Sequence, residues 1–234
     1  MIVSTSAWAA DTKDDQPDVV KRIDNAGNVL TEIMGTPDKA IPDKVLSDAR
    51  CIVIIPSMIK IAVGFGGNHG KGVATCRTDR GWSAPAPVTI TGGSWGLQLG
   101  GQAIDLVMLV MNQRGLDSML SSKFKLGADA SAAAGPVGRD AGADTDWKMK
   151  SEVLSYSRAR GLFAGVDLNG AALTQDKDET RILYGKMEPF KDILAGDVPA
   201  PHSAHSFLAT VAKYAPNTPS KQGSLTPQTS PSGN

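Results

Sequence analysis

Short strand-like segments separated by glycine, with no helical pattern between most of them, limit the possible folds of this chain more than any other feature. From residue 51 to residue 173 the sequence alternates apolar and polar positions in runs of strand length. Turn sequences such as residues 79–81 (DRG) separate these runs. We therefore predict an α+β fold built on a mainly antiparallel, glycine-rich β-sheet or a barrel-like sandwich.

The first predicted strand is the apolar run at residues 51–56, which Pro56 is expected to end. The glycine-rich residues 64–70 are predicted to form a turn. Further strands are predicted at residues 72–78, 88–91, 95–99, 102–111, 124–128, 149–156 and 161–168, with additional β-structure to residue 173 and around residues 181–184.

An N-terminal amphipathic helix is predicted where apolar residues recur every three or four positions from Val19 to Ile33. Pro17 and Gly35 are suitable residues for its two ends. Its polar face mixes bases with acids, so we expect it to dock on the core, whereas a membrane-surface helix would carry a basic face. Short flanking helices are predicted at residues 43–49, 115–122, 190–194 and 207–214.

The chain is predicted to hold one domain, residues 17–214, with a flexible segment before it and a disordered tail after it. Residues 7–9 (AWA), followed by a charged run, read like the end of a secretory signal peptide, so residues 1–16 are interpreted as its remnant. Residues 215–234 are rich in proline, serine and threonine and cannot bury a core. We expect an exported protein, periplasmic or associated with the cell envelope.

The two cysteines, Cys51 and Cys76, fit an exported protein with one disulfide. Both also fall in predicted strands, where buried free thiols are common, so the sequence leaves their pairing open. No Cys-x-x-Cys motif is present, which excludes a zinc ribbon or a thioredoxin-type centre.

The charge balance argues against a nucleic-acid partner. The chain has 24 basic and 24 acidic residues, so it has no global positive field. The distribution is uneven, because residues 1–49 hold nine acids and five bases (net −4), whereas residues 50–81 hold five bases and one acid (net +4). Either a local positive face results, or the acidic segment packs over it.

Templates for enzymes and metal sites do not fit the sequence. The segment around Gly70 and Lys71 lacks the glycine and the Ser or Thr that a phosphate-binding loop requires. His202 and His205 could share a helix face, but no third metal ligand has suitable spacing. No Gly-x-Ser-x-Gly motif occurs either. We therefore expect no catalytic residue, no metal and no cofactor.

Asp105 is unusual because it interrupts an otherwise apolar strand. A buried carboxylate needs a cation, hydrogen bonds or a proton. The candidate partners are Arg139, Arg158 and Arg160. The pair would either fix the strand register or form a polar pocket for a ligand head group; a third reading, in which Asp105 is an enzymatic acid or base, is weaker.

Several sequence blocks, in order, resemble the SYLF-domain family of lipid-binding modules. They include residues 50–56 (RCIVIIP), 81–85 (GWSAP), 92–102 (GGSWGLQLGGQ), 133–139 (AAGPVGR), 156–166 (YSRARGLFAGV) and 184–185 (YG). The resemblance covers roughly residues 20–187.

The resemblance implies a non-enzymatic domain that binds phospholipid. In eukaryotic relatives the domain binds phosphoinositides and is tied to actin patches, whereas an exported protein would meet anionic bacterial lipids. We therefore expect peripheral membrane contact through a basic and apolar face, formed by Arg50, Lys60, Lys71, Met58, Ile59 and Phe65. The alternative is a structural or protein-interaction module of the cell envelope.

Overall fold

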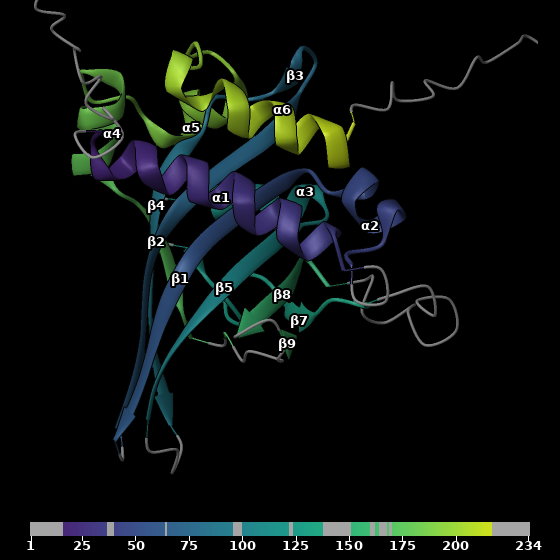
Figure 1. Cartoon of the computed structure of the whole chain (residues 1–234), viewed down its shortest axis with the longest axis vertical. Helices are drawn as coiled ribbons and strands as arrows, with labels where there is room; N and C mark the ends of the chain where they lie inside the picture. The colour runs from purple at the N-terminus through teal and green to yellow at the C-terminus, as the bar shows by residue number, and fades with distance from the viewer. Residues whose placement is uncertain are drawn as a thin grey trace, which may run out of the picture.

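The computed structural model describes residues 16–36, 40–63, 65–95, 100–121, 124–137, 151–159, 162–163, 168 and 170–216. Its strands form one curled, open sheet in the order β6-β10-β4-β2-β1-β5-β8-β7, with β3 on β2 and β9 on β8. All pairings are antiparallel except the one between β7 and β8. The predicted α+β fold with an antiparallel sheet is confirmed, in the form of a half-barrel flanked by helices (Figure 1).

The strands are β1 (Cys51–Val63), β2 (Phe65–Thr78), β3 (Gly81–Trp82), β4 (Ala86–Trp95), β5 (Gly100–Val110), β6 (Phe124–Lys125), β7 (Ala132–Ala134), β8 (Val153–Ala159), β9 (Leu162–Phe163) and β10 (Ala172–Gln175). The helices are α1 (Asp18–Met34), α2 (Asp43–Asp48), α3 (Gln113–Met119), α4 (Lys177–Tyr184), α5 (Phe190–Ala195) and α6 (His205–Tyr214), with a short 3₁₀ turn η2 (His202–Ala204).

The sheet is buried on both faces in the body of the molecule. On one face, α1 and α6 pack against Ile52, Ile54 and Val107 through side chains that include Ile23 and Leu30. The other face forms a second apolar cluster with α5 and the curled ends of the sheet. Burial of one such isoleucine or leucine stabilises the fold by about 1.5–3 kcal/mol, so α1 docks on the core as its sequence pattern predicts.

One helix was missed, because residues 181–184 were predicted as β-structure. They belong to α4, which begins where the Asp176 carboxylate accepts a hydrogen bond from the Glu179 backbone N–H. The helix ends at Gly185, whose φ of 72° lies in the left-handed region that glycine tolerates. Both end signals are local and outweigh the apparent strand pattern.

The prediction of a glycine-rich turn at residues 64–70 is also wrong, since β2 already begins at Phe65. The prediction that Pro56 ends the first strand fails as well, because β1 continues through it to Val63. The strand passes Pro56 by a β-bulge: Ile55 pairs with Leu106 and Met58 with Ile104, so two residues oppose Asp105. A bulge is one of the few places where a sheet accepts proline.

The glycines of β2 accommodate this bulge. A Cβ atom on Gly72 would lie 2.1 Å from the Ile54 carbonyl oxygen and 2.8 Å from the Ile55 Cα. A Cβ on Gly70 would lie 2.6 Å from Ile55 Cγ2 and 2.9 Å from Met58 Cγ. The bulged strand therefore approaches the β2 backbone so closely that only glycine fits.

Other parts of the sequence-based assignment lie partly outside the described residues. The predicted strand at residues 149–156 is found as β8, which begins at Val153, and the predicted strand at 161–168 is described only as β9. Most of the strand predicted at 95–99, the N-terminal segment up to residue 15 and the tail from residue 217 lie outside the described residues. In the described ranges, every helix is too short or too polar to cross a lipid bilayer.

Candidate functional site

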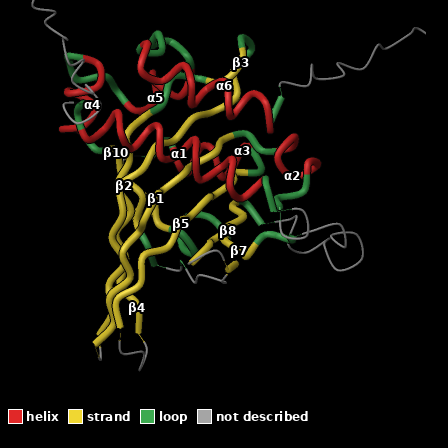
Figure 2. The backbone as a smooth tube through the Cα atoms, in the orientation of Figure 1, coloured by secondary structure: helices red, strands yellow, loops and turns green. Residues whose placement is uncertain are grey.

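Four neighbouring strands run past the helices and form a projecting sheet end, which comprises residues 59–63, 65–69, 91–95 and 100–103. Figures 1 and 2 show β1, β2, β4 and β5 extending beyond the helical part of the molecule. The pairing is continuous to the end, since Val63 pairs with Phe65, and Phe65 with Trp95. On the other side of β1, Ala62 pairs with Gly100. The ends of β4 and β5 therefore lie on either side of the β1–β2 hairpin.

Two of the residues predicted to contact lipid remain available on this projecting sheet end. The Ile59 side chain is 50% exposed, although strands flank β1 on both sides. Lys60 is the next residue along the strand and is half-buried on the opposite face. Phe65 occupies the strand position opposite Val63 and Trp95.

The structure does not assemble the expected basic face. Arg50 is exposed, but it precedes β1, whereas Lys60 lies ten positions further along the strand. At about 3.3 Å per residue these two cations are roughly 30 Å apart. They cannot contact the same lipid head group.

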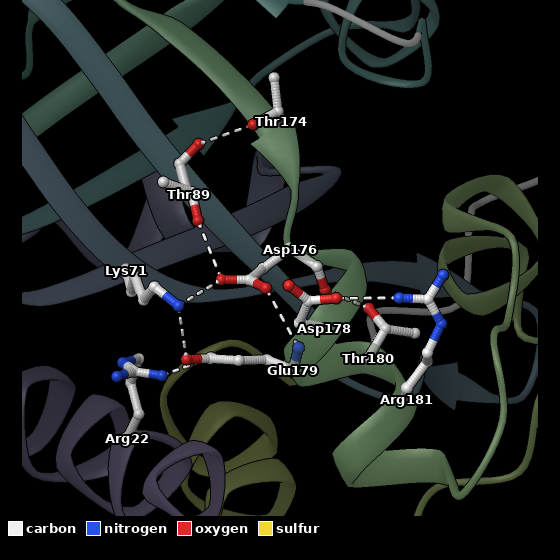
Figure 3. A network of polar contacts seen from close by, with 9 residues as sticks. All are labelled: Arg22, Lys71, Thr89, Thr174, Asp176, Asp178, Glu179, Thr180 and Arg181. Carbon is white, nitrogen blue, oxygen red and sulfur yellow. Dashed lines mark hydrogen bonds and ion pairs between the residues drawn. The ribbon is translucent and has the colours of Figure 1, made fainter.

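The structure does not support the prediction that Lys71 contacts lipid, because its ammonium group lies in a charge cluster between β2, α4 and α1 (Figure 3). Its Nζ is 2.8 Å from an Asp176 carboxylate oxygen and 3.0 Å from one of Glu179, which also accepts a hydrogen bond from Arg22. Asp176 also accepts a hydrogen bond of 3.1 Å from Thr89. Lys71 thus ties the sheet to two helices and is not free to bind lipid.

The charge cluster shifts the pKa of its members in opposite directions. The hydrogen bond to Asp176 raises the pKa of Lys71 against the effect of partial burial. Burial acts to raise the pKa of Asp176, but hydrogen bonds from Lys71 and from the Glu179 backbone outweigh it, so that pKa lies below its usual value. Both residues are held in their charged forms.

The structure also contradicts the prediction that Met58 contacts lipid, since its side chain is fully buried. The bulge at Pro56 and Ser57 places Met58 on the same face as Ile55, inside the apolar cluster that includes Ile104. A residue in this position contributes to the core and cannot insert into a membrane.

The structure places Asp105 opposite Arg158, one of its three candidate partners. Arg158 Nη2 donates a 2.9 Å hydrogen bond to Asp105 Oδ2, and the Ser57 backbone N–H donates one of 3.0 Å to Oδ1. Arg158 also pairs with Glu32 of α1. The Asp105 side chain is 20% exposed, so it is less buried than its apolar neighbours suggested. Its two oxygens hold the bulge and β8 in register.

The remaining candidates are placed as follows. Arg139 and Arg160 lie outside the described residues. Cys51 and Cys76 face each other on β1 and β2 and form a disulfide, and both are buried. Among the described residues, no three His, Cys, Asp or Glu side chains are grouped so that they could hold a metal ion.

Two sequence blocks that carry the family resemblance, residues 133–139 and 156–166, contact each other where they are described. The residue after β7, Gly135, lies against Tyr156 of β8, and a Cβ on this glycine would be 2.1 Å from Tyr156 Cζ. Tyr156 is 2% exposed, and burial raises the pKa of its hydroxyl far above the usual value. This contact could not be predicted from local patterns, because it depends on a parallel pairing between segments about twenty positions apart.

A polar groove of about 680 Å³ lies between α1 and α6. Its lining includes the side chains of Lys21, Asp24, Asn28, Ser206 and Thr210. Its lining is polar and includes both Lys21 and Asp24, so it differs from the basic and apolar lipid site expected from the sequence. The groove was not predicted from the sequence.

A family model described as Ysc84, Las17-binding protein actin regulator, matches residues 91–214. This range is more than half of the 234-residue chain. The chain belongs to the Ysc84 family. The resemblance to SYLF domains is thereby confirmed, and the matched range runs from β4 to α6.

Similar proteins contain this Ysc84 domain as part of longer chains. The SH3 domain-containing YSC84-like protein 1 of Homo sapiens is 34% identical over 180 residues, which are 76% of this chain and 52% of the relative. The rat protein of the same name is 33% identical over 180 residues, with 76% and 53% covered. Protein YSC84 of Saccharomyces cerevisiae is 33% identical over 184 residues, with 77% and 39% covered. The chain therefore spans about half or less of the length of these relatives.

Proposed function

We propose that this Ysc84 domain is a non-enzymatic, peripheral membrane-binding domain that recognises anionic phospholipid. The observation that carries the proposal is the half-exposed Ile59 beside Lys60, at an end of the sheet that the helices leave uncovered. An aliphatic side chain next to a cation suits the boundary between lipid head groups and acyl chains. The family resemblance to lipid-binding SYLF domains points the same way.

The expected affinity is low and depends on salt. A lysine near an anionic membrane contributes about 1 kcal/mol, and salt screens that attraction. Arg50 is too distant to add to it, and Lys71 is already paired with two carboxylates. Stable binding therefore needs apolar insertion by the projecting sheet end in addition to charge.

An enzymatic role for Asp105 is not favoured by its surroundings. Both of its carboxylate oxygens accept hydrogen bonds, one from Ser57 and one from Arg158. A general acid or base needs an oxygen that reaches the substrate. The residue is better explained as a structural ion pair.

We further propose that the protein is exported to the periplasm or the cell envelope, which the disulfide between Cys51 and Cys76 supports. In that compartment the lipid would be an anionic bacterial phospholipid, and actin would not be accessible. A role as a protein-interaction module is the second candidate. The printed family description, a Las17-binding actin regulator, and the polar groove between α1 and α6 favour it.

Vesicle co-sedimentation tests the proposal. The protein is mixed with phosphatidylcholine vesicles, with and without phosphatidylglycerol, at low and at high salt. We expect binding to the vesicles that contain phosphatidylglycerol and a decrease in binding at high salt. Absence of binding to both vesicle types at low salt would overturn lipid binding and leave the protein-interaction module as the better reading.

A further inference from the structure

The strand register divides the positions of the projecting sheet end between two faces. Ile59, Ile61 and Val63 alternate along β1, and residues two apart in a strand share a face. Ile59 pairs with His69 and Ala103, and His69 pairs with Thr91, so these positions belong to the same face. This is the face that α1 covers in the body of the molecule, where Ile52 and Ile54 contact the helix. We name it the apolar face.

The apolar face is uncovered at the projecting sheet end. Each of its residues with a described side-chain environment is exposed: Ile59, Gly67, His69, Thr91, Gly93 and Ala103. On the opposite face Asn68 is buried and Lys60 is half-buried, whereas Gln102 is exposed. The strand positions on both sides of Ile61 are glycines, Gly67 and Gly101, which have no side chain.

Charge is almost absent from this part of the chain. Residues 59–70 and 90–104 contain one charged residue, Lys60, although charged residues make up 21% of the whole sequence. A water-exposed extension would normally carry many more charges. At the projecting sheet end, the described residues of the apolar face include no Asp, Glu, Lys or Arg, and Lys60 follows Ile59 on the opposite face. An exposed aliphatic side chain with a single cation near it is complementary to a bilayer with anionic head groups.

The geometry points to end-on insertion of the projecting sheet end into a lipid bilayer, with the apolar face in contact with the acyl chains. From Ile59 to Val63 the strand advances about 13 Å, which is enough to pass the 5–10 Å that interfacial elements reach. The helices and the polar groove then remain on the aqueous side. This inference rests on the proposed lipid binding and specifies the residues and the orientation.

A bilayer fits better than a folded protein partner or a second copy of the chain. A specific protein interface combines an apolar centre with a rim of polar and charged groups. In the sequence of this segment Lys60 is the one charge available for such a rim. A fluid bilayer needs no such rim and accepts a glycine-rich, smooth surface.

Two exposed isoleucines provide a matched test. Ile59 is 50% exposed at the projecting sheet end, and Ile182 is 60% exposed on α4 in the body. In vesicle co-sedimentation with phosphatidylglycerol, we expect Ile59→Asp to weaken binding about tenfold or more, because it removes an apolar contact and adds repulsion. We expect Ile182→Asp to bind as the unchanged protein does. Circular dichroism checks that both variants fold.

Fluorescence reports insertion directly. The two native cysteines are joined in a disulfide, so an NBD label reacts with the introduced thiol in Ile59→Cys or Ile182→Cys. With vesicles that contain lipids brominated in the acyl chain, we expect quenching and a blue shift at position 59 and neither change at position 182.

The outcomes separate this inference from the proposed function. If the unchanged protein binds vesicles while position 59 is not quenched and Ile59→Asp binds normally, end-on insertion is overturned and lipid binding stands. If Ile59→Asp instead abolishes self-association, measured by light scattering without vesicles, the apolar face belongs to a second copy. If the unchanged protein binds no vesicles, both proposals fail.

Discussion

Gly72 offers the sharpest test of the packing described for the bulge. An added Cβ would lie 2.1 Å from the Ile54 carbonyl oxygen and 2.8 Å from Ile55 Cα, and both are backbone atoms of a central strand. The neighbour cannot rotate away as a flexible side chain could, so β1 and β2 must separate locally. We expect Gly72→Ala to lower the free energy of unfolding by about 3 kcal/mol, at the upper end of typical overpacking costs.

Gly27 is the matched control, because it lies in the middle of α1. An added Cβ there would meet its nearest atom, Phe207 Cα, at 3.8 Å, which is an ordinary contact. Glycine within a helix is less favourable than alanine by about 0.8–1.0 kcal/mol. We therefore expect Gly27→Ala to raise the free energy of unfolding by about 1 kcal/mol.

Urea denaturation followed by circular dichroism, with the disulfide kept oxidised, measures both effects. For a domain of this size, 1 kcal/mol corresponds to roughly 2–4 °C in Tm, so thermal scans provide an independent check. The reasoning is refuted if Gly72→Ala unfolds within 0.5 kcal/mol of the unchanged protein, an interval typical of surface substitutions. It is equally refuted if the two alanine variants shift stability in the same direction.

Three further predictions concern the polar contacts and the disulfide. Asp105→Ala leaves the mostly buried Arg158 without that partner, and we expect urea denaturation to show a loss of about 1–3 kcal/mol; an unchanged midpoint would contradict the register role. The pKa of Asp176 is lowered in the folded state, so its contribution is present above the unfolded pKa of about 3.9 and is lost as the pH falls through the folded value. We therefore expect the free energy of unfolding of Asp176→Asn to change less with pH below about pH 4 than that of the unchanged protein. The same pH dependence in both proteins would contradict stabilisation by the Asp176 carboxylate. Cys51 and Cys76 are 25 residues apart, so we expect reduction of their disulfide to lower the free energy of unfolding by about 3.5 kcal/mol through loop entropy. Denaturation with and without reductant measures this difference, and equal stability under both conditions would exclude stabilisation by the disulfide.

Elements with a regular local pattern could be predicted from the sequence. The three- and four-residue spacing from Val19 to Ile33 predicts α1, because the helical period is a property of neighbouring residues alone. Helix α4 was missed although its two end signals, Asp176 and Gly185, are present in the sequence.

Features that depend on contacts between distant residues could not be predicted. The sequence limited the partner of Asp105 to three arginines, but the choice of Arg158 depends on the register between β5 and β8. The ion pairs of Lys71 could not be predicted, because both of its carboxylate partners lie more than 100 positions further along the chain. The glycines at residues 64–70 suggested a turn, whereas Gly70 and Gly72 accommodate the bulge in the neighbouring strand.

The bulge also decides which residues reach the apolar face. Before it, Ile52 and Ile54 contact α1, so a regular strand would continue on this face with even-numbered residues, including Lys60. The extra residue at Pro56 and Ser57 reverses the alternation, as a register shift of one residue does. Met58 then enters the core, and Ile59 and the alternate positions after it fall on the uncovered face. Asp105 holds the bulge through Ser57 and pairs with Arg158, which also pairs with Glu32 of α1. Two ion pairs that share Arg158 therefore couple the packing of the helix to the face proposed to enter the membrane.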